Sequence, residues 1–523
     1  MLFKKIKKIK IVLFPRWMVF ILFTSLFPVI HFFNVNKIQL LPFHYFKFFT
    51  YFCIIFISAL FTIIFTKRLI LRFIDIEKIA FVIAITILIY FVYIPIANFS
   101  ISVGIPKIVY IFFILGSPVL GILLSRYQNI LKIFSVMIVV AVLIPLSQIA
   151  YYNFELYFLD KDKKLQAVQE KLDYDFVKAK NLPNVYYFVP DTYMRSDRVK
   201  KILGHNNNPF IEQLSKQGFY IAARSYSNYP TTFLSVTSAL AMDYVATEEM
   251  EPFLNKNKFF RILAGHNPTV LRFKKHGYRF ARAPSGRWDP GRCNGVEDIC
   301  LTEGFGVSEV DYQFWRPSLF YKIASKFKWV DNSAKTTFKD IKQSLINLEL
   351  DKPTFVFGHI EMPHPPYEFD SNCERHYNLG SVFSWWGDKM KFFYLEELIC
   401  ANKQIIELVE LINEKDPNSI IVIQADTGTH WGYETANTFS VTPLSEWTTR
   451  ELEENFANFT AFKIPKIYQN RLYHSISQVN AFRLIFSIIE DREPSFLPDY
   501  SYATHYEFNP EFGKVHKYDR KDR

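Results

Sequence analysis

Five long apolar runs in the first third of this 523-residue chain limit what it can fold into. They cover residues 15–35, 42–66, 79–97, 108–125 and 133–151. Each run is close to the ~20 residues that a membrane-spanning helix needs. The first run is long for a signal peptide and four more follow it, so we interpret it as an uncleaved span. Runs of this length disfavour the alternative of a buried soluble core. The pattern predicts an N-terminal α-helical transmembrane bundle of about five spans.

The basic residues gather in this apolar part. Residues 1–150 hold 15 Lys/Arg and only two acids, so they carry +13, and the rest of the chain carries −2 of the total of +11. The N-terminus and the loops after the second and fourth runs are basic, whereas the other two loops carry only Lys37 and Lys107. The positive-inside rule then predicts a cytoplasmic N-terminus and places everything after Tyr152 outside. A basic face on a soluble domain is missing, which argues against nucleic-acid binding.

The composition changes twice after the last apolar run. We expect a transmembrane domain at 1–152, a charged linker or stalk helix at 153–183 and an extracytoplasmic domain at 184–523. In the third part, short apolar runs alternate with helical patterns. This alternation predicts an α/β domain with a mostly parallel sheet and helices on both faces.

The predicted elements of this domain are short and regularly punctuated. Strands are expected at Val185–Val189, Tyr220–Ala223, Tyr278–Ala281, Thr354–His359 and Ser419–Asp426. Helices are expected at Pro209–Gly218, from Thr232, at Thr269–His276, Lys391–Ile412 and Ser477–Ile489.

Four of the five cysteines fall in the predicted outer domain, where oxidation is possible, and Cys53 falls in a span. Cys293 and Cys300 suit a short loop, and Cys373 and Cys400 suit a longer one. Four cysteines allow three pairings, and unpaired buried thiols are a further alternative. The absence of a Cys-x-x-Cys pair disfavours metal binding by these thiols.

Three predicted strands end in a group that binds metals or anions. Asp191 follows the first of them, and His359 and Asp426 end two others. Ligands bind at the carboxyl ends of the strands of an open parallel sheet. The two carboxylates offer hard oxygens to a divalent cation. A strand-end Asp is also a common turn former, so the prediction depends on these groups occurring together.

Thr231 and Thr232 precede a segment with helical spacing. The free N–H groups and the positive dipole end at a helix N-terminus favour a tetrahedral anion. A metal ion beside Thr232 lowers the pKa of its hydroxyl and makes it a nucleophile. The competing interpretation is an ordinary helix cap, which Ser and Thr often provide.

His364 lies between prolines in the segment from Gly358 to Tyr367. Proline fixes φ, so this histidine is presented from a stiff loop, where it can assist a leaving group. A surface-loop histidine without a role is the alternative.

Taken together, these segments resemble a known family. Asn184-Val-Tyr-Tyr-Phe-Val-Pro-Asp191, Ser227-Asn-Tyr-Pro-Thr-Thr232, His359-Ile-Glu-Met-Pro-His-Pro-Pro-Tyr367 and Ile421-Val-Ile-Gln-Ala-Asp426 are similar to the sulfatase-like branch of the alkaline phosphatase superfamily. The similarity is greatest to its multi-span bacterial membrane members, which are related to lipoteichoic acid synthases and phosphoethanolamine transferases.

The resemblance implies one divalent metal ion (Zn, Mn, Mg or Ca) and a covalent threonine intermediate. It implies Asp191, Thr232 and Asp426 as metal ligands and Thr232 as the nucleophile. His364 would be the second catalytic residue, and His359 and Thr231 would bind the substrate. The implied location is the bacterial inner membrane, with a periplasmic C-terminal domain.

Two positions depart from the family pattern. The family has Asp-His-Gly where this chain has Asp426-Thr427-Gly428, so a hydroxyl stands in place of a histidine ligand. His430 follows closely, and we expect it to complete the site. The first motif has Asp191-Thr-Tyr where Asp-Gly-Tyr is expected.

These features favour a membrane-anchored transferase or hydrolase of phosphate esters, of the phosphoglycerol or phosphoethanolamine type. The expected partners are a membrane-lipid donor and an envelope glycan or lipid acceptor; the sequence does not predict an oligomeric state. One alternative is a sulfatase, although the Cys/Ser-x-Pro-x-Arg motif of that class is not found at Thr232. A second alternative is a catalytically impaired homologue with a role in envelope assembly, for which Thr427 is the main argument.

Overall fold

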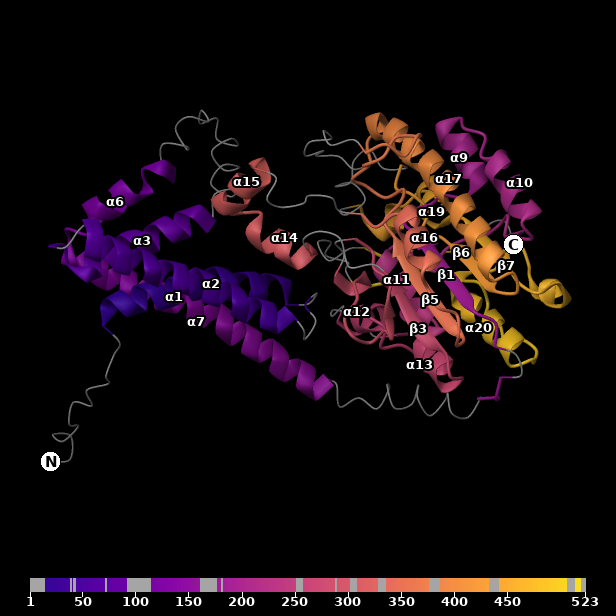
Figure 1. Ribbon diagram of the computed structural model, residues 1–523, viewed down its shortest axis with the longest axis horizontal. Coiled ribbons are helices and arrows are strands. Elements are labelled where there is room, and N and C mark those ends of the chain that lie inside the picture. Colours follow the sequence, from indigo (N-terminus) through magenta and orange to yellow (C-terminus); the bar gives the residue numbers. More distant parts are fainter. Residues whose placement is uncertain are drawn as a thin grey trace. The chain divides into compact units, whose positions relative to one another are not determined.

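The computed structural model describes residues 15–37, 40, 44–70, 73–91, 114–159, 176–179, 182–250, 257–286, 289–301, 308–327, 335–375, 386–431, 442–505 and 513–518. The chain divides into two compact units, each drawn in Figure 1. The first comprises Met1–Lys163 and Glu309–Asn332, and the second Lys164–Ser308 and Ser333–Arg523. The segment Glu309–Asn332, which the sequence pattern places in the C-terminal domain, thus groups with the apolar N-terminal part. Most of the predicted linker, at 160–175, lies outside the described residues.

The described part of the first unit is helical. Its helices are α1 (Arg16–Asn36), α2 (His44–Phe65) continued by the π-helical turn Thr66–Ile70, α3 (Ile76–Phe91), α6 (Ser117–Leu124), α7 (Gln128–Leu159), α14 (Glu309–Trp315) and α15 (Leu319–Lys326). Three helical stretches, Arg16–Asn36, His44–Arg68 and Gln128–Phe154, are long and apolar enough to cross a membrane. They correspond to the first, second and fifth predicted spans.

The other two predicted spans are only partly described. The run at 79–97 is described as far as Phe91, and the run at 108–125 from Ile114 onward. The count of five spans therefore stays a prediction.

The membrane bundle has an interior and an apolar exterior. Phe20 and Phe81 are fully buried, and their rings pack edge to face with centroids 5.7 Å apart. On the exterior, Phe46 is 77% exposed, and Ile57 and Val136 are each 63% exposed. Large apolar side chains exposed in such number are typical of a surface that faces lipid.

The second unit contains a seven-stranded sheet with the order β2-β7-β6-β1-β5-β3-β4. The strands are β1 (Val185–Pro190), β2 (Tyr220–Ile221), β3 (Arg279–Ala283), β4 (Ile299–Cys300), β5 (Thr354–Ile360), β6 (Ile420–Gln424) and β7 (Thr460–Lys463). The five strands from β6 to β4 are parallel, and β7 pairs antiparallel with both β6 and β2. The prediction of a mostly parallel sheet is confirmed, and β4 and β7 were not predicted.

The remaining elements surround this sheet. The helices are α9 (Ser196–Leu203), α10 (Asn208–Lys216), α11 (Thr232–Ala241), α12 (Asn257–Leu263), α13 (Pro268–Lys275), α16 (Phe338–Ile346), α17 (Lys391–Lys415), α19 (Thr449–Phe456) and α20 (Gln478–Ile489). Short 3-10 turns occur at Asp289–Gly291, Asp388–Met390, Leu444–Glu446 and Lys466–Arg471, and β8 (Ser501–Ala503) pairs with β9 (His516–Tyr518).

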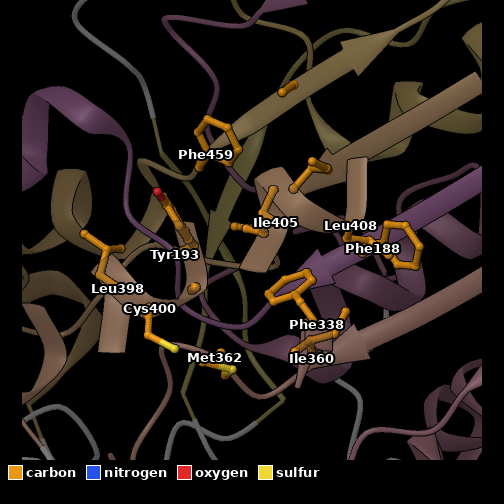
Figure 2. Close-up of a cluster of buried hydrophobic side chains, with 14 of the residues drawn as sticks. Phe188, Tyr193, Phe338, Ile360, Met362, Leu398, Cys400, Ile405, Leu408 and Phe459 are labelled. Atoms are coloured by element: carbon orange, nitrogen blue, oxygen red, sulfur yellow. The ribbon is translucent and has the colours of Figure 1, made fainter. Parts of the chain in front are cut away.

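Successive residues of β1 point to opposite faces of the sheet, and both faces are covered by helices. Phe188 belongs to a buried cluster with Phe338 of α16 and with Ile405 and Leu408 of α17 (Figure 2). On the opposite face, the ring of Tyr187 lies 4.8 Å from that of Phe482 in α20. The prediction of helices on both faces is therefore confirmed.

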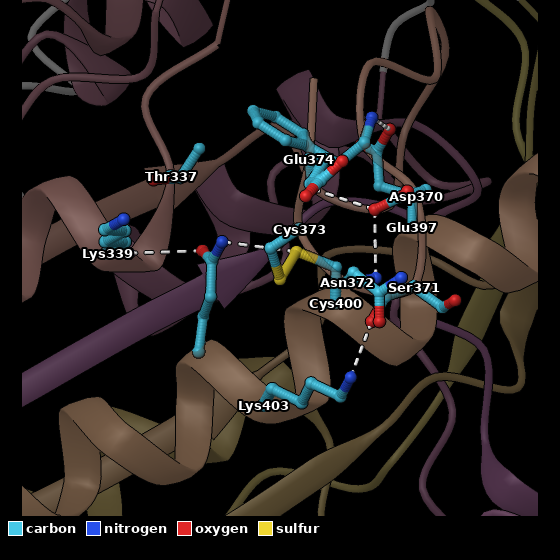
Figure 3. Close-up of a disulfide and its surroundings, with 12 residues drawn as sticks. Thr337, Lys339, Asp370, Ser371, Asn372, Cys373, Glu374, Glu397, Cys400 and Lys403 are labelled. Atoms are coloured by element: carbon cyan, nitrogen blue, oxygen red, sulfur yellow. Dashed lines mark hydrogen bonds between the residues drawn. A yellow bond between two sulfur atoms is a disulfide. The ribbon is translucent and has the colours of Figure 1, made fainter. Parts of the chain in front are cut away.

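Both suggested disulfides form. Cys293 pairs with Cys300, and Cys373 pairs with Cys400. The second bond joins the turn after β5 to α17, where Lys403 also donates to the carbonyl of Ser371 (Figure 3). The alternative of unpaired thiols is wrong for these four residues, and Cys53 in α2 is a free thiol.

Candidate active site

Three adjacent parallel strands bring the predicted strand-end groups together. β1 lies between β5 and β6, and Val189 is level with His359 in the register. As a result, ligand atoms of Asp191, His359 and Asp426 all lie within 4.8 Å of one another. His359 Nε2 is 3.5 Å from Asp191 Oδ2 and 3.9 Å from Asp426 Oδ2. We call these three residues the carboxylate–imidazole cluster.

The burial of the cluster makes its charges costly. Burial raises the pKa of Asp191 well above its usual value, and the neighbouring Asp426 and Glu361 raise it further. Burial also acts to raise the pKa of Asp426, but hydrogen bonding to His359 and Thr232 outweighs it, and that pKa is lowered. Two carboxylates and an imidazole around one point suit a divalent cation such as Zn²⁺. Asp191 Oδ1 is buried without a hydrogen-bond partner among the described residues, as expected of an oxygen that ligates a cation.

Asp426 is held in place by several donors. Its Oδ1 accepts the backbone N–H of Thr192 at 2.8 Å and that of Thr427 at 2.6 Å. Its Oδ2 accepts the hydroxyl of Thr232 at 2.6 Å. The carboxylate thus links the cluster directly to the predicted nucleophile.

Thr232 is the first residue of α11, and Thr231 occupies the N-cap position. Thr231 makes no side-chain cap hydrogen bond; its carbonyl accepts the N–H groups of Leu234 and Ser235. Its hydroxyl is buried and has no partner within the described chain. The interpretation as an ordinary helix cap therefore applies to the position of Thr231 but not to either hydroxyl.

His430 is not one of the three residues whose ligand atoms gather within 4.8 Å, although the charge of Asp426 acts to raise its pKa. His430 is buried, its Nδ1 contacts Asn455 Oδ1, and its ring lies 5.1 Å from that of Trp386. Burial lowers its pKa to about 4. Thr427 directs its hydroxyl to the carbonyl of Gly428 at 3.1 Å. The imidazole that lies with the two carboxylates belongs to His359, for which the sequence predicts substrate binding, and the role of His430 stays a prediction.

His364 follows β5 in a loop and lies beside a buried ion pair. Lys335 Nζ contacts the backbone oxygen of His364 and Glu397 Oε1, and both charged side chains are fully buried. Burial and the charge of Lys335 lower the pKa of His364 to about 3, while Asp426 opposes this shift. The side chain is therefore a neutral imidazole at pH 7. Its Nδ1 lies 2.5 Å from the carbonyl of Pro365 and donates to it, so its Nε2 is left as a hydrogen-bond acceptor.

Three residues near the predicted site were missed from the sequence. Lys335 and Glu397 are 62 positions apart, and neither ends a predicted strand. Trp386 lies between two histidines, with its ring 6.2 Å from that of His364 and 5.1 Å from that of His430. None of the three carries a local sequence signal, because their placement depends on how distant segments pack.

A scan against protein-family models and a search of curated proteins found no match. Among solved structures, the C-terminal periplasmic domain of EcEptC from Escherichia coli is 12% identical, with a TM-score of 0.42 over 66% of this chain and 95% of that chain. The integral membrane protein lipooligosaccharide phosphoethanolamine transferase A from Neisseria meningitidis is 13% identical, with a TM-score of 0.37 over 90% of this chain and 95% of that chain. The C-terminal periplasmic domain of phosphoethanolamine transferase EptC from Campylobacter jejuni is 12% identical, with a TM-score of 0.34 over 61% of this chain and 94% of that chain.

Proposed function

We propose that this protein is a metal-dependent transferase, anchored in the bacterial inner membrane, that moves a phospho-substituent through a covalent intermediate on Thr232. The observation that carries the proposal is the hydrogen bond from Thr232 to Asp426, 2.6 Å long, within the carboxylate–imidazole cluster. A hydroxyl at a helix N-terminus, next to two buried carboxylates and an imidazole, combines a nucleophile with a cation site.

Asp191, His359 and Asp426 would hold the cation. When bound, the cation would neutralise the phosphate oxygens and favour the ionised threonine hydroxyl. Thr232 Oγ1 would then attack phosphorus, forming a P–O bond to threonine and breaking the bond to the leaving lipid alcohol. The hydroxyl proton has an acceptor in Asp426 Oδ2. In a second step, an acceptor hydroxyl would attack the same phosphorus and release Thr232.

The surrounding residues would stabilise and orient the phosphoryl group. The N-terminus of α11 presents a positive dipole end at Thr232, which favours an anion there. Because its Nδ1 donates to the carbonyl of Pro365, the neutral His364 would offer Nε2 as a hydrogen-bond acceptor to a substrate hydroxyl. Because the pKa of His364 is lowered to about 3, we assign it this role rather than that of a general acid at neutral pH.

The membrane bundle supports a lipid donor, because it keeps the enzyme at the bilayer. We propose phosphatidylethanolamine or phosphatidylglycerol as the donor class and an envelope glycan or lipid as the acceptor. The basic loops support a cytoplasmic N-terminus and a periplasmic C-terminal domain. Five spans remain part of this proposal.

Two rival functions are less well supported. A sulfatase of the usual kind needs a Cys or Ser in a Cys/Ser-x-Pro-x-Arg motif, and Thr232-Phe-Leu-Ser-Val236 lacks it. An impaired homologue was suggested by Thr427, since a hydroxyl is a weak metal ligand. His359 weakens this argument, because it brings an imidazole to the cluster from a different strand.

The experiment is a trapping assay with the full-length protein in detergent, supplied with Zn²⁺ or Mn²⁺. The protein is incubated with phosphatidylethanolamine or phosphatidylglycerol labelled in the head group, without an acceptor. We expect a labelled phospho-substituent on the peptide that contains Thr232, and we expect EDTA to abolish it. A metal-loaded, folded protein that acquires no label from either lipid would contradict the proposal.

A further inference from the structure

Helix α14, encoded between β4 and β5, packs into the membrane bundle. Phe314 is 3% exposed, and its ring stacks on that of Tyr51 in α2 with centroids 4.5 Å apart. The same ring meets that of Phe32 in α1 edge to face at 5.4 Å. Trp315 lies 5.7 Å from Phe91 of α3. One short helix thus contacts three helices of the bundle.

A polar contact fixes the orientation of α14. Lys47 Nζ lies 3.0 Å from Asp311 Oδ2, and the hydroxyl of Tyr51 donates to Asp311 Oδ1. Both partners come from the first two turns of α2. A partly buried, hydrogen-bonded ion pair beside an aromatic cluster has a defined geometry, unlike an isolated surface pair.

The bundle residues that contact α14 all lie toward one side of the predicted membrane. Phe32 is near the C-terminus of α1, Tyr51 is in the N-terminal half of α2, and Phe91 ends α3. Alternating spans place these three helix ends on the same side, and the positive-inside rule predicts that it is the outer side. The same rule, together with five spans, places the chain that leads to α14 outside, so the position of α14 is consistent with the predicted topology.

Helix α15 continues from this anchor with an apolar stripe. Phe320 is 48% exposed and Ile323 is 43% exposed, and residues three apart lie on the same face of a helix. Leu319 packs against the buried Ile114 of the bundle, as Ile89 and Tyr90 also do. Arg316 and Lys326 are exposed at the two ends of this segment.

We propose that α14 and α15 form an interfacial membrane element, with Phe320 and Ile323 inserted at the boundary between lipid head groups and acyl chains in the outward-facing leaflet. The occupant of the stripe is therefore bilayer lipid. Two observations favour lipid. The stripe adjoins the end of α3, since the ring of Phe320 lies 6.1 Å from that of Tyr90, and it continues the exposed apolar exterior of the bundle.

The amino-acid composition of α14 and α15 is also typical of segments that lie at the membrane–water interface. Aromatic residues gather at the head-group level of membranes, and Arg and Lys beside an apolar stripe attract lipid phosphates. Tyr312, Trp315 and Tyr321 accompany Arg316 and Lys326 in this short segment. The inference does not depend on the reaction proposed above, because none of these residues belongs to the carboxylate–imidazole cluster.

The test is a collision measurement on spin-labelled, full-length protein. Cys53 is replaced by alanine, the native disulfides are kept, and a nitroxide is attached to I323C in vesicles of phosphatidylethanolamine and phosphatidylglycerol. Reference labels are I57C on the exposed apolar face of α2 and E410C on an exposed position of α17. Oxygen, which partitions into lipid, and a water-soluble nickel chelate are the two relaxing agents.

We expect the label at position 323 to resemble the label at position 57, with a ratio of oxygen to nickel collisions several-fold above that at position 410. A ratio equal to that at position 410 would show that the stripe faces water and would overturn the proposal. Low collision rates with both agents would also overturn it, because they would show that protein covers the stripe. The collision ratios do not depend on catalysis, so each of these three results keeps its meaning even if the protein transfers no phosphoryl group.

Discussion

Replacing Thr232 with alanine should lower phosphoryl transfer by a factor on the order of 10⁴ or more, because removal of a covalent nucleophile leaves only the residual effect of binding and electrostatics. The substitution removes the oxygen that donates to Asp426 Oδ2 at 2.6 Å. It should leave the fold intact, because Thr232 is at the start of α11 and alanine is the best helix former. The rate is measured on the full-length, metal-loaded protein with a head-group-labelled phospholipid.

Two control variants separate the loss of the Thr232 hydroxyl from a general effect of substitution in α11. T232S keeps a hydroxyl on the β-carbon of residue 232 and should retain a substantial part of the transfer rate. S238A removes a buried hydroxyl from the same helix, where Ser238 donates only to the carbonyl of Ser235, and should retain nearly the whole rate. If T232A were as active as S238A, the covalent threonine intermediate would be wrong.

Replacing Asp191 with asparagine should stabilise the metal-free protein while it abolishes metal binding. The pKa of Asp191 is raised by burial and by Asp426, so the ionised side chain opposes folding. For an acid with a raised pKa in the folded state, the free energy of unfolding falls as the pH rises from about 4, the unfolded value, to the folded value. Asparagine does not ionise, so at pH 7 the free energy of unfolding of the metal-free variant should exceed that of the metal-free wild type.

The same variant should lose the stabilisation that a cation gives to the wild type. Zn²⁺ at 100 times its Kd stabilises a folded protein by about 2.7 kcal/mol. Thermal unfolding of the full-length chain, with chelator and with Zn²⁺, measures both effects. D388N, at an aspartate whose side chain is 91% exposed, should change neither. A D191N protein that is less stable than wild type without metal, or equally stabilised by Zn²⁺, would contradict this description of the site.

The strands that carry the site were predictable because each is a continuous apolar run followed by a polar group. β1, β5 and β6 fall where the runs ending at Asp191, His359 and Asp426 predict them. β7 was not predictable in this way, since Thr460–Lys463 is four residues long and pairs antiparallel.

The position of each histidine depends on how the strands align in the sheet, and the sequence pattern does not show that alignment. Which imidazole meets the carboxylates depends on how neighbouring strands align and on which face of the sheet each side chain takes, and sequence spacing alone does not show this. His430 is close to Asp426 in sequence, but its Nδ1 contacts Asn455. His359 is 67 positions away from Asp426, and its neighbour in the sheet, Val189, places it beside Asp191.

The packing of α14 into the bundle was also not predictable from the sequence. No helix is predicted at Glu309–Trp315 from the sequence, and the contacts of Phe314 and Asp311 show that this segment packs with the first unit. Likewise, the burial of Lys335 against Glu397 follows from tertiary packing and has no local signature.

The central claim is that Asp191, His359 and Asp426 hold a divalent cation beside Thr232. Anomalous X-ray diffraction from crystals of the full-length protein grown with Zn²⁺ tests this claim most directly. We expect one strong anomalous peak, which marks a Zn²⁺ ion at about 2.0–2.2 Å from an oxygen of each aspartate and from His359 Nε2. Thr232 Oγ1 should lie next to this ion. An ion bound through His430 in place of His359, or no ion at these carboxylates while Zn²⁺ is present in excess, would contradict the account.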